Sequence, residues 1–100
     1  MTSYREHLAQ HLRLAILRCL AEAPGYSLNT SILRDAVGAL GLPASRDLIE
    51  TEGQWLAEQG HATRAELPAG VVILTITERG LDVAAGRAAA PGVQRPAPRS

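Results

Sequence analysis

The stretch Val71–Gly86, VVILTITERGLDVAAG, changes its pattern halfway along its length. Its first part is an almost unbroken run of β-branched and apolar residues, which is typical of a β-strand. From Thr77 onward the apolar residues are spaced as in a short helix, which the Thr77 side chain can cap and the Glu78 charge can stabilise. The stretch therefore predicts a strand that leads directly into a helix ending near Arg87. The helix residues predicted to face inward are Leu81, Ala84 and Ala85.

The residues before this strand predict the first half of a β-hairpin. The segment 61–66 shows a weak alternation of side-chain types, as a half-exposed strand does. Leu67–Gly70, LPAG, combines proline with glycine and is typical of a turn. We therefore expect 61–66 and 71–77 to pair as antiparallel neighbours.

The chain begins with a long predicted helix, from about Ser3 to Ala23. Pro24–Gly25 ends this helix, because proline disfavours helical geometry in the residue before it. The inward side is predicted to carry Leu8, Leu12, Ala15, Ile16, Cys19 and Leu20. A second apolar patch lies roughly opposite and consists of Leu14, Leu17 and Ala21. The helix thus has two sides to cover, and the second patch is a candidate surface for a partner.

A short strand at 26–28 is followed by a second helix, which Asn29 or Thr30 can cap and Gly41 stops. Its predicted apolar residues are Ile32, Leu33, Ala36, Val37 and Leu40. After a turn of about four residues, Ser45 can cap a third helix. The predicted inward side of the third helix is Leu48, Ile49, Glu52, Trp55, Leu56 and Gln59.

With Gly60 closing the third helix, the predicted order is helix, short strand, helix, turn, helix, hairpin, helix. The turn between the second and third helices has the length of a helix-turn-helix connection. The sequence thus predicts an α+β fold of the winged helix-turn-helix class, with a three-helix core, a β-hairpin wing and a C-terminal helix. We assign residues 1–88 to this domain. The remaining segment, 89–100, contains prolines and arginines and is expected to be a flexible tail.

Two parts of the chain resemble known families. The segments WLAEQGHATRAE (Trp55–Glu66) and VVILTITERGLDVA (Val71–Ala84) resemble the recognition-helix end, wing and closing helix of bacterial regulators of the MarR, PadR and ArsR kind. Residues 4–95, including LAEAPGYSLN and TERGLDVAAG, are similar to small winged-helix proteins of Mu-like phages and prophages. This resemblance implies a homodimeric transcriptional regulator that binds double-stranded DNA.

The composition places the chain among ordinary globular proteins. Of its 100 residues, 46% are hydrophobic and 20% are charged, and the formal net charge is zero. There is no apolar stretch of the roughly 20 residues that a membrane span needs and no signal-peptide pattern, so we expect a cytoplasmic protein. Residues 1–88 carry eight arginines against all ten acids, so the expected domain is slightly acidic.

The resemblance implies that the third helix would lie in the major groove of DNA. Residues 45–59 carry one arginine and four acids, and the wing tip LPAG has no cation, both of which count against DNA as the partner. The candidate DNA-binding residues are Arg34, Ser45, Arg46, Glu50, Thr51, Gln54 and Arg64.

A protein–protein interaction module without specific DNA binding is the alternative. Val71 and Ile73 lie on one face of their strand, and the residues between them on the other face are also apolar. In a hairpin with one solvent-exposed face, apolar and polar residues should alternate along the strand. We therefore expect a second copy, a phage or host protein, or the chain's own termini to cover part of the surface. The candidate interface residues are Leu14, Leu17, Ala21, Val71 and Ile73.

The sequence shows no enzyme signature. It has no nucleophile motif, no phosphate-binding glycine loop and no paired carboxylates with an evident role, so we predict no enzymatic activity and no cofactor. His7 and His11 share one side of a helix, but two ligands do not make a metal site, and none is predicted. We expect Glu52 to pair with an arginine or a backbone amide. Arg95 and Arg99 in the tail are expected to be solvated.

Overall fold

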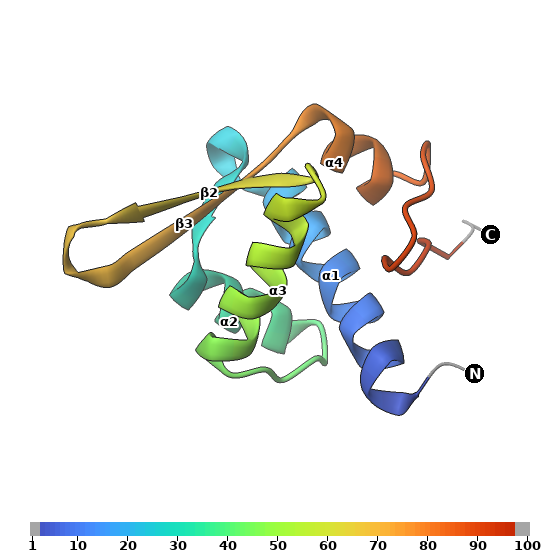
Figure 1. Ribbon diagram of the computed structural model, residues 1–100, viewed down its shortest axis with the longest axis horizontal. Coiled ribbons are helices and arrows are strands. Elements are labelled where there is room, and N and C mark those ends of the chain that lie inside the picture. Colours follow the sequence, from blue (N-terminus) through green and yellow to red (C-terminus); the bar gives the residue numbers. More distant parts are fainter. Residues whose placement is uncertain (1–2, 98–100) are drawn as a thin grey trace.

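The helix α1 (Tyr4–Glu22) runs through the middle of the computed structural model, which describes residues 3–97 (Figure 1). Ser3 caps it, since its Oγ accepts a hydrogen bond from the Glu6 backbone N–H at 3.1 Å. The helix packs against three other helices and one strand. Both apolar sides predicted from the sequence are therefore covered by the chain itself. The most buried residues of α1 are Leu12, Ile16, Leu17 and Leu20.

This packing corrects one prediction. Leu14 and Leu17 were expected to face a partner, yet Leu17 is fully buried and Leu14 is 7% exposed. Ala21 is half-buried and packs against the core. Because α1 is the central helix of the fold, α2, α3 and α4 share its circumference, and these residues are not free to form an interface.

The helices α2 (Thr30–Ala39) and α3 (Arg46–Glu58) follow, joined by residues 40–45. Each begins at the polar residue expected to cap it. Asn29 Oδ1 accepts from the Ile32 backbone N–H at 2.8 Å, and Ser45 Oγ accepts from that of Leu48 at 3.1 Å. These two caps confirm the predicted helix starts.

Helix α2 buries a narrower side than its sequence predicts. Of the apolar residues noted in its sequence, Leu33 and Val37 are fully buried, whereas Ile32 is 51% exposed and Leu40 is 60% exposed. The helix lies against the remainder of the fold along a single stripe, which 33 and 37 occupy at a spacing of one turn.

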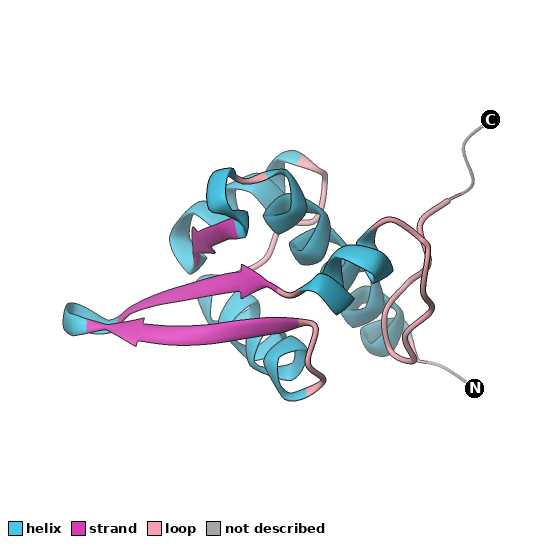
Figure 2. Ribbon diagram, turned by 90° about the horizontal axis from the view of Figure 1, so that it is seen from above, coloured by secondary structure: helices cyan, strands magenta, loops and turns pink. Residues whose placement is uncertain are grey.

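The sheet has three antiparallel strands: β1 (Ser27–Asn29), β2 (Ala62–Leu67) and β3 (Val71–Ile76). The order is β1-β3-β2, so the short strand near the N-terminus pairs with the second strand of the hairpin. The hairpin extends away from the helices, and its tip is one end of the molecule (Figures 1 and 2). The predicted antiparallel pairing is confirmed, and the predicted turn at Pro68–Gly70 has Ala69 and Gly70 in the left-handed region, at φ 70° and 75°.

The predicted corner between strand and helix is confirmed at Thr77, whose Oγ1 accepts from the Gly80 backbone N–H at 3.1 Å. Helix α4 (Glu78–Ala84) is shorter than expected, since it was predicted to reach Arg87. Its buried residues are Gly80 and Val83, whereas Ala85 is exposed. A Cβ atom at Gly80 would overlap the His61 carbonyl oxygen, so α4 and the start of β2 approach each other closely only because residue 80 is glycine.

The segment after α4 differs from the flexible tail expected for 89–100. Ala90 and Val93 are each 7% exposed and belong to the core. The Gln94 backbone N–H donates to the Gln10 carbonyl oxygen at 3.2 Å, which fastens the segment to α1. We call residues 88–94 the C-terminal strap. Arg95 is exposed, as expected, and Arg99 lies outside the described residues.

Candidate functional site

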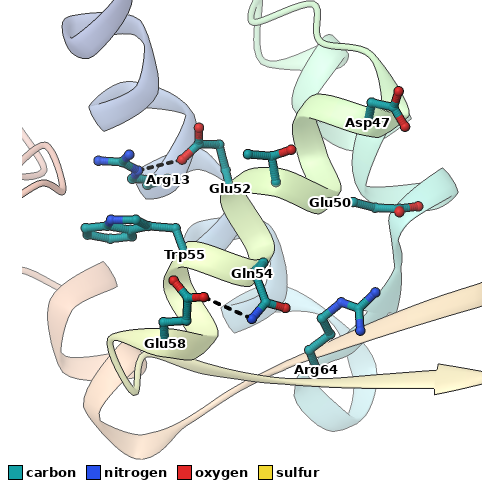
Figure 3. Close-up of a pocket in the computed structure, with 9 residues that line it drawn as sticks. Arg13, Asp47, Glu50, Glu52, Gln54, Trp55, Glu58 and Arg64 are labelled. Atoms are coloured by element: carbon teal, nitrogen blue, oxygen red, sulfur yellow. Dashed lines mark hydrogen bonds and ion pairs between the residues drawn. The ribbon is translucent and has the colours of Figure 1, made fainter.

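The exposed side of α3 forms a shallow hollow with β2 of the hairpin (Figure 3). Its volume is about 630 Å³. The charged side chains that line it are two arginines and four carboxylates: Arg13, Arg64, Asp47, Glu50, Glu52 and Glu58. The hollow therefore has a negative formal charge, and we call this surface the acidic α3 face.

The residues on the open part of this face recur along one side of the helix. Asp47, Thr51, Gln54 and Glu58 are all exposed and follow one another at intervals of three or four residues. Gln54 Nε2 donates to Glu58 Oε2 at 3.2 Å. A molecule approaching α3 thus meets two carboxylates, one amide and one hydroxyl.

The three arginines predicted to contact DNA each form an ion pair with a neighbouring carboxylate. Arg46 Nε lies 3.1 Å from Glu50 Oε2, and Arg64 Nη2 lies 3.2 Å from Glu66 Oε1. Arg34 Nε lies 3.5 Å from Asp35 Oδ1. Exposed pairs of this kind add little stability. However, each pair places a carboxylate beside the arginine, so a phosphate that contacts the arginine must also approach a negative charge.

These arginines also come from three different elements. Arg34 belongs to α2, Arg46 is the first residue of α3, and Arg64 is in β2. Of the three, Arg64 lines the hollow.

Two other candidates have structural partners. Ser45 uses its hydroxyl oxygen to cap α3. Glu50 accepts from Arg46 and also from the Thr30 hydroxyl, at 3.2 Å. The structure therefore gathers Glu50, Thr51, Gln54 and Arg64 on one surface, but it does not add Arg34 to them.

Beside the acidic α3 face lies a buried ion pair that sequence reasoning found only in part. Arg13 Nε donates to Glu52 Oε1 at 2.7 Å, and each side chain is 9% exposed. The Arg13 guanidinium also lies 3.9 Å from the centre of the Trp55 ring, and its Nη1 donates to the Gly92 carbonyl oxygen at 2.9 Å. A partner for Glu52 was predicted, and this is confirmed. Arg13 could have been recognised as that partner, because it lies three and seven residues before Ile16 and Leu20 on the same side of α1.

His61 is a second buried polar residue, between α3 and β2. Its side chain is 2% exposed, and its Nδ1 has no hydrogen-bond partner among the described residues. Burial, together with the nearby charge of Arg79, lowers the pKa of His61. The imidazole is therefore neutral in the folded chain.

The predicted interface residues of the hairpin are partly open. Val71 is 37% exposed and pairs with Leu67, which is 47% exposed, so both sit on the same side of the sheet near the tip. Ile73 is half-buried between Ala65 and Asn29, its neighbours in the register. Val71 therefore stays a candidate contact, whereas Ile73 is largely covered.

Within residues 3–97, no three histidine, cysteine or acidic side chains come together in a group that could hold a metal ion. None of the helices in that range is both long and apolar enough to span a bilayer.

The chain is similar to two known proteins over most of its length. It is 44% identical over 93 residues to the uncharacterized protein gp26 of Escherichia phage Mu, which covers 93% of this chain and 95% of gp26. It is 43% identical over 79 residues to an uncharacterized protein of Haemophilus influenzae, strain KW20 Rd, which covers 79% of this chain and 76% of that protein. No family model and no solved structure matches the chain.

Proposed function

Because this chain belongs to the family of gp26 of Escherichia phage Mu, we propose that it is a winged-helix phage protein that docks a protein partner through its acidic α3 face. Two parts of this proposal have separate support. The order and pairing of the elements support the fold class, and the charge of α3 supports the kind of partner.

The winged-helix assignment is supported by the order and pairing of the elements. Helices α1, α2 and α3 pack against one another, and a hairpin follows α3. The short strand between α1 and α2 pairs with β3, in the register Ser27 with Thr75. In a winged helix the hairpin is likewise tied to the helical core rather than free on both edges. The connection between α2 and α3 has six residues, 40–45, and is longer than the predicted turn of about four. It is within the range of about two to eight residues that is usual between packed helices.

The observation that carries the proposed partner class is the excess of carboxylates on the acidic α3 face, which is lined by four acids and two arginines. A DNA-binding surface needs the opposite excess, because contacts between cations and phosphates supply most of its affinity. On the acidic α3 face, a phosphate close enough to contact an arginine would also lie near unpaired carboxylates, which repel it. A protein partner with a basic surface meets no such penalty, and charge complementarity would orient it.

The regulator implied by the family resemblance makes a different quantitative prediction. A dimer in which all three arginines of each protomer contacted phosphate would make about six contacts, and its log affinity would fall with log salt at a slope of about −5. The docking function predicts no measurable affinity for duplex DNA. The first test is therefore a titration with the DNA upstream of the chain's own gene and with random duplex, at low and moderate salt. Arg46→Ala is measured alongside.

The second test identifies the partner directly. A photo-crosslinking amino acid is placed at Thr51, which is exposed on the acidic α3 face, and a control is placed at Asp35, which is exposed on α2. In phage-producing cells we expect a protein adduct at 51 and none at 35. The captured protein is then purified, and Glu58→Arg should weaken its binding at least about tenfold. Salt-dependent DNA binding that Arg46→Ala weakens would overturn the docking function in favour of the regulator.

A further inference from the structure

A second hollow, of about 1160 Å³, lies between α1, α4 and the end of the described chain. Three arginines from three segments line it: Arg18 from α1, Arg87 from just after α4, and Arg95 from just beyond the C-terminal strap. Among the described residues that line it, Glu22 is the one acid. We call it the basic hollow, since its formal charge is opposite in sign to that of the acidic α3 face.

The basic hollow opens away from the acidic α3 face. Arg13 marks the side of α1 that contacts α3, through its ion pair with Glu52. Arg18 follows five residues later, which places it about 140° further round the helix at 3.6 residues per turn. The strap and α4 lie at the end of the molecule opposite to the hairpin tip (Figures 1 and 2). The two charged surfaces can therefore be occupied at the same time.

The arginines of the basic hollow are available to a ligand. Arg18 and Arg95 are exposed. Arg87 Nε donates to Asp82 Oδ1 at 3.0 Å, yet its side chain is 64% exposed. Because a guanidinium carries five N–H donors, Arg87 keeps most of its donors for a second carboxylate.

The size and lining of the basic hollow favour a protein surface as its occupant. Its volume of about 1160 Å³ exceeds the roughly 300–1,000 Å³ of typical small-molecule sites. Half of its lining residues are leucine, alanine or proline, including Leu81, Ala84 and Pro96. Surfaces that bind DNA are more polar and more uniformly basic, whereas arginine among apolar residues is typical of protein–protein interfaces.

We infer that the basic hollow binds the acidic α3 face of a second copy of this chain, in a head-to-tail contact. This rests on the proposed function of α3 as a protein-docking surface. The chain itself supplies the complementary ligand, because Asp47 and Glu58 are exposed on that face and would meet Arg18, Arg87 and Arg95. A head-to-tail contact uses two different surfaces, so it repeats from copy to copy and produces a ring or an open chain rather than a closed dimer.

Charge reversal of each surface tests this inference. Arg18→Glu changes the basic hollow, and Glu58→Arg changes the acidic α3 face; both positions are exposed, and an arginine in the last turn of α3 suits the helix dipole. Arg5→Glu and Asp35→Arg are the matched controls, at exposed positions outside both surfaces. Association is measured by sedimentation velocity at about 50 mM and about 500 mM salt. Circular dichroism checks that each variant is folded.

We expect the wild-type chain to associate beyond a dimer at low salt and to dissociate at high salt. Arg18→Glu alone and Glu58→Arg alone should each raise the dissociation constant at least about tenfold. An equimolar mixture of the two should associate again, because the reversed hollow of one complements the reversed face of the other. The two controls should behave as wild type.

Other outcomes would overturn the inference, and each has a distinct consequence for the proposed function. A chain that stays monomeric at low salt overturns it, while crosslinking from Thr51 to another protein would still support α3 as a docking surface. Loss of association in Glu58→Arg but not in Arg18→Glu assigns self-contact to α3 alone and removes the role of the basic hollow. Duplex DNA that binds the wild type and is lost in Arg18→Glu shows that the hollow contacts phosphate instead. That last result overturns the inference even if self-association is seen.

Discussion

At the scale of single residues, the stability of this small domain depends on a buried arginine that has several partners at once. Arg13 contacts Glu52, the Trp55 ring and the Gly92 carbonyl oxygen, which belong to α3 and to the C-terminal strap. Its charge is therefore compensated in a place from which water is excluded. Removing Glu52 is costly, because the buried charge of Arg13 then keeps only the half-exposed carboxylate of Glu6, which lies 3.4 Å from its Nη1.

We expect Glu52→Ala to lower the free energy of unfolding by about 3 kcal/mol or more. Urea denaturation followed by circular dichroism measures the change. The double variant Arg13→Met, Glu52→Leu is the control, since replacing both charges with apolar side chains of similar size should cost much less than the single change. If the double variant is less stable than Glu52→Ala, the ion pair contributes a net stabilisation that two apolar side chains of similar size cannot replace.

His61 predicts the pH dependence of stability. In the folded chain the pKa of His61 lies below the value of about 6.5 expected of an unfolded chain. The unfolded state thus binds more protons below that pH, and the free energy of unfolding should fall as the pH falls from about 6.5 toward 5. His61→Leu should flatten this dependence, measured as the urea midpoint at several pH values.

At the scale of secondary-structure elements, local chemistry predicted the starts of the helices well. Ser45 and Thr77 cap the helices that they were expected to cap, and Asn29, one of two predicted alternatives, caps α2. Ser3, for which no capping role was predicted, caps α1. Capping depends on a short side chain and the next few backbone amides, so the sequence contains all of its determinants. The inward sides were harder to predict, as the exposed Gln59 and Ala85 show, because they depend on how much of each helix its neighbours cover.

Two glycines in helices should respond in opposite directions to the same substitution. A Cβ at Gly80 would overlap the His61 carbonyl oxygen, so Gly80→Ala must separate α4 from β2 and should destabilise the fold by about 1–3 kcal/mol. A Cβ at Gly38 would meet nothing within 4 Å, so Gly38→Ala should stabilise α2 by about 0.5–1 kcal/mol. Thermal denaturation of the two variants makes the comparison. A loss of stability in both would mean that α2 is covered by something beyond this chain.

At the scale of the whole molecule, the distribution of charge could be read from the sequence only in outline. The excess of acids in residues 45–59 correctly indicated an acidic α3. The basic hollow could not be predicted, because Arg18, Arg87 and Arg95 are far apart in sequence and meet only through the packing of α4 and the strap on α1. A net charge of zero thus conceals two surfaces of opposite sign.

The C-terminal strap shows why the domain boundary at residue 88 was placed too early. Its sequence has the proline, glycine and alanines of a flexible segment, but Ala90 and Val93 enter the core and Gly92 lies against Trp55. These contacts join residues nearly 80 positions apart, through the Arg13 bond to the Gly92 carbonyl oxygen. Periodicity within a segment cannot reveal contacts of that kind, because it describes only the segment's own pattern.

A truncation after residue 88 should therefore lower the free energy of unfolding by about 3 kcal/mol, from the loss of Val93 burial and of one acceptor for Arg13. The fluorescence of Trp55, the chain's single tryptophan, should shift to longer wavelength as the ring becomes exposed. A truncation after residue 94 is the control and should resemble the full chain, because it keeps Ala90 to Gln94 and removes the exposed Arg95 and Ala97. If the shorter chain instead unfolds at the same urea concentration as the longer one, the contacts of the strap with α1 and α3 add no stability. The structural domain would then end near residue 88.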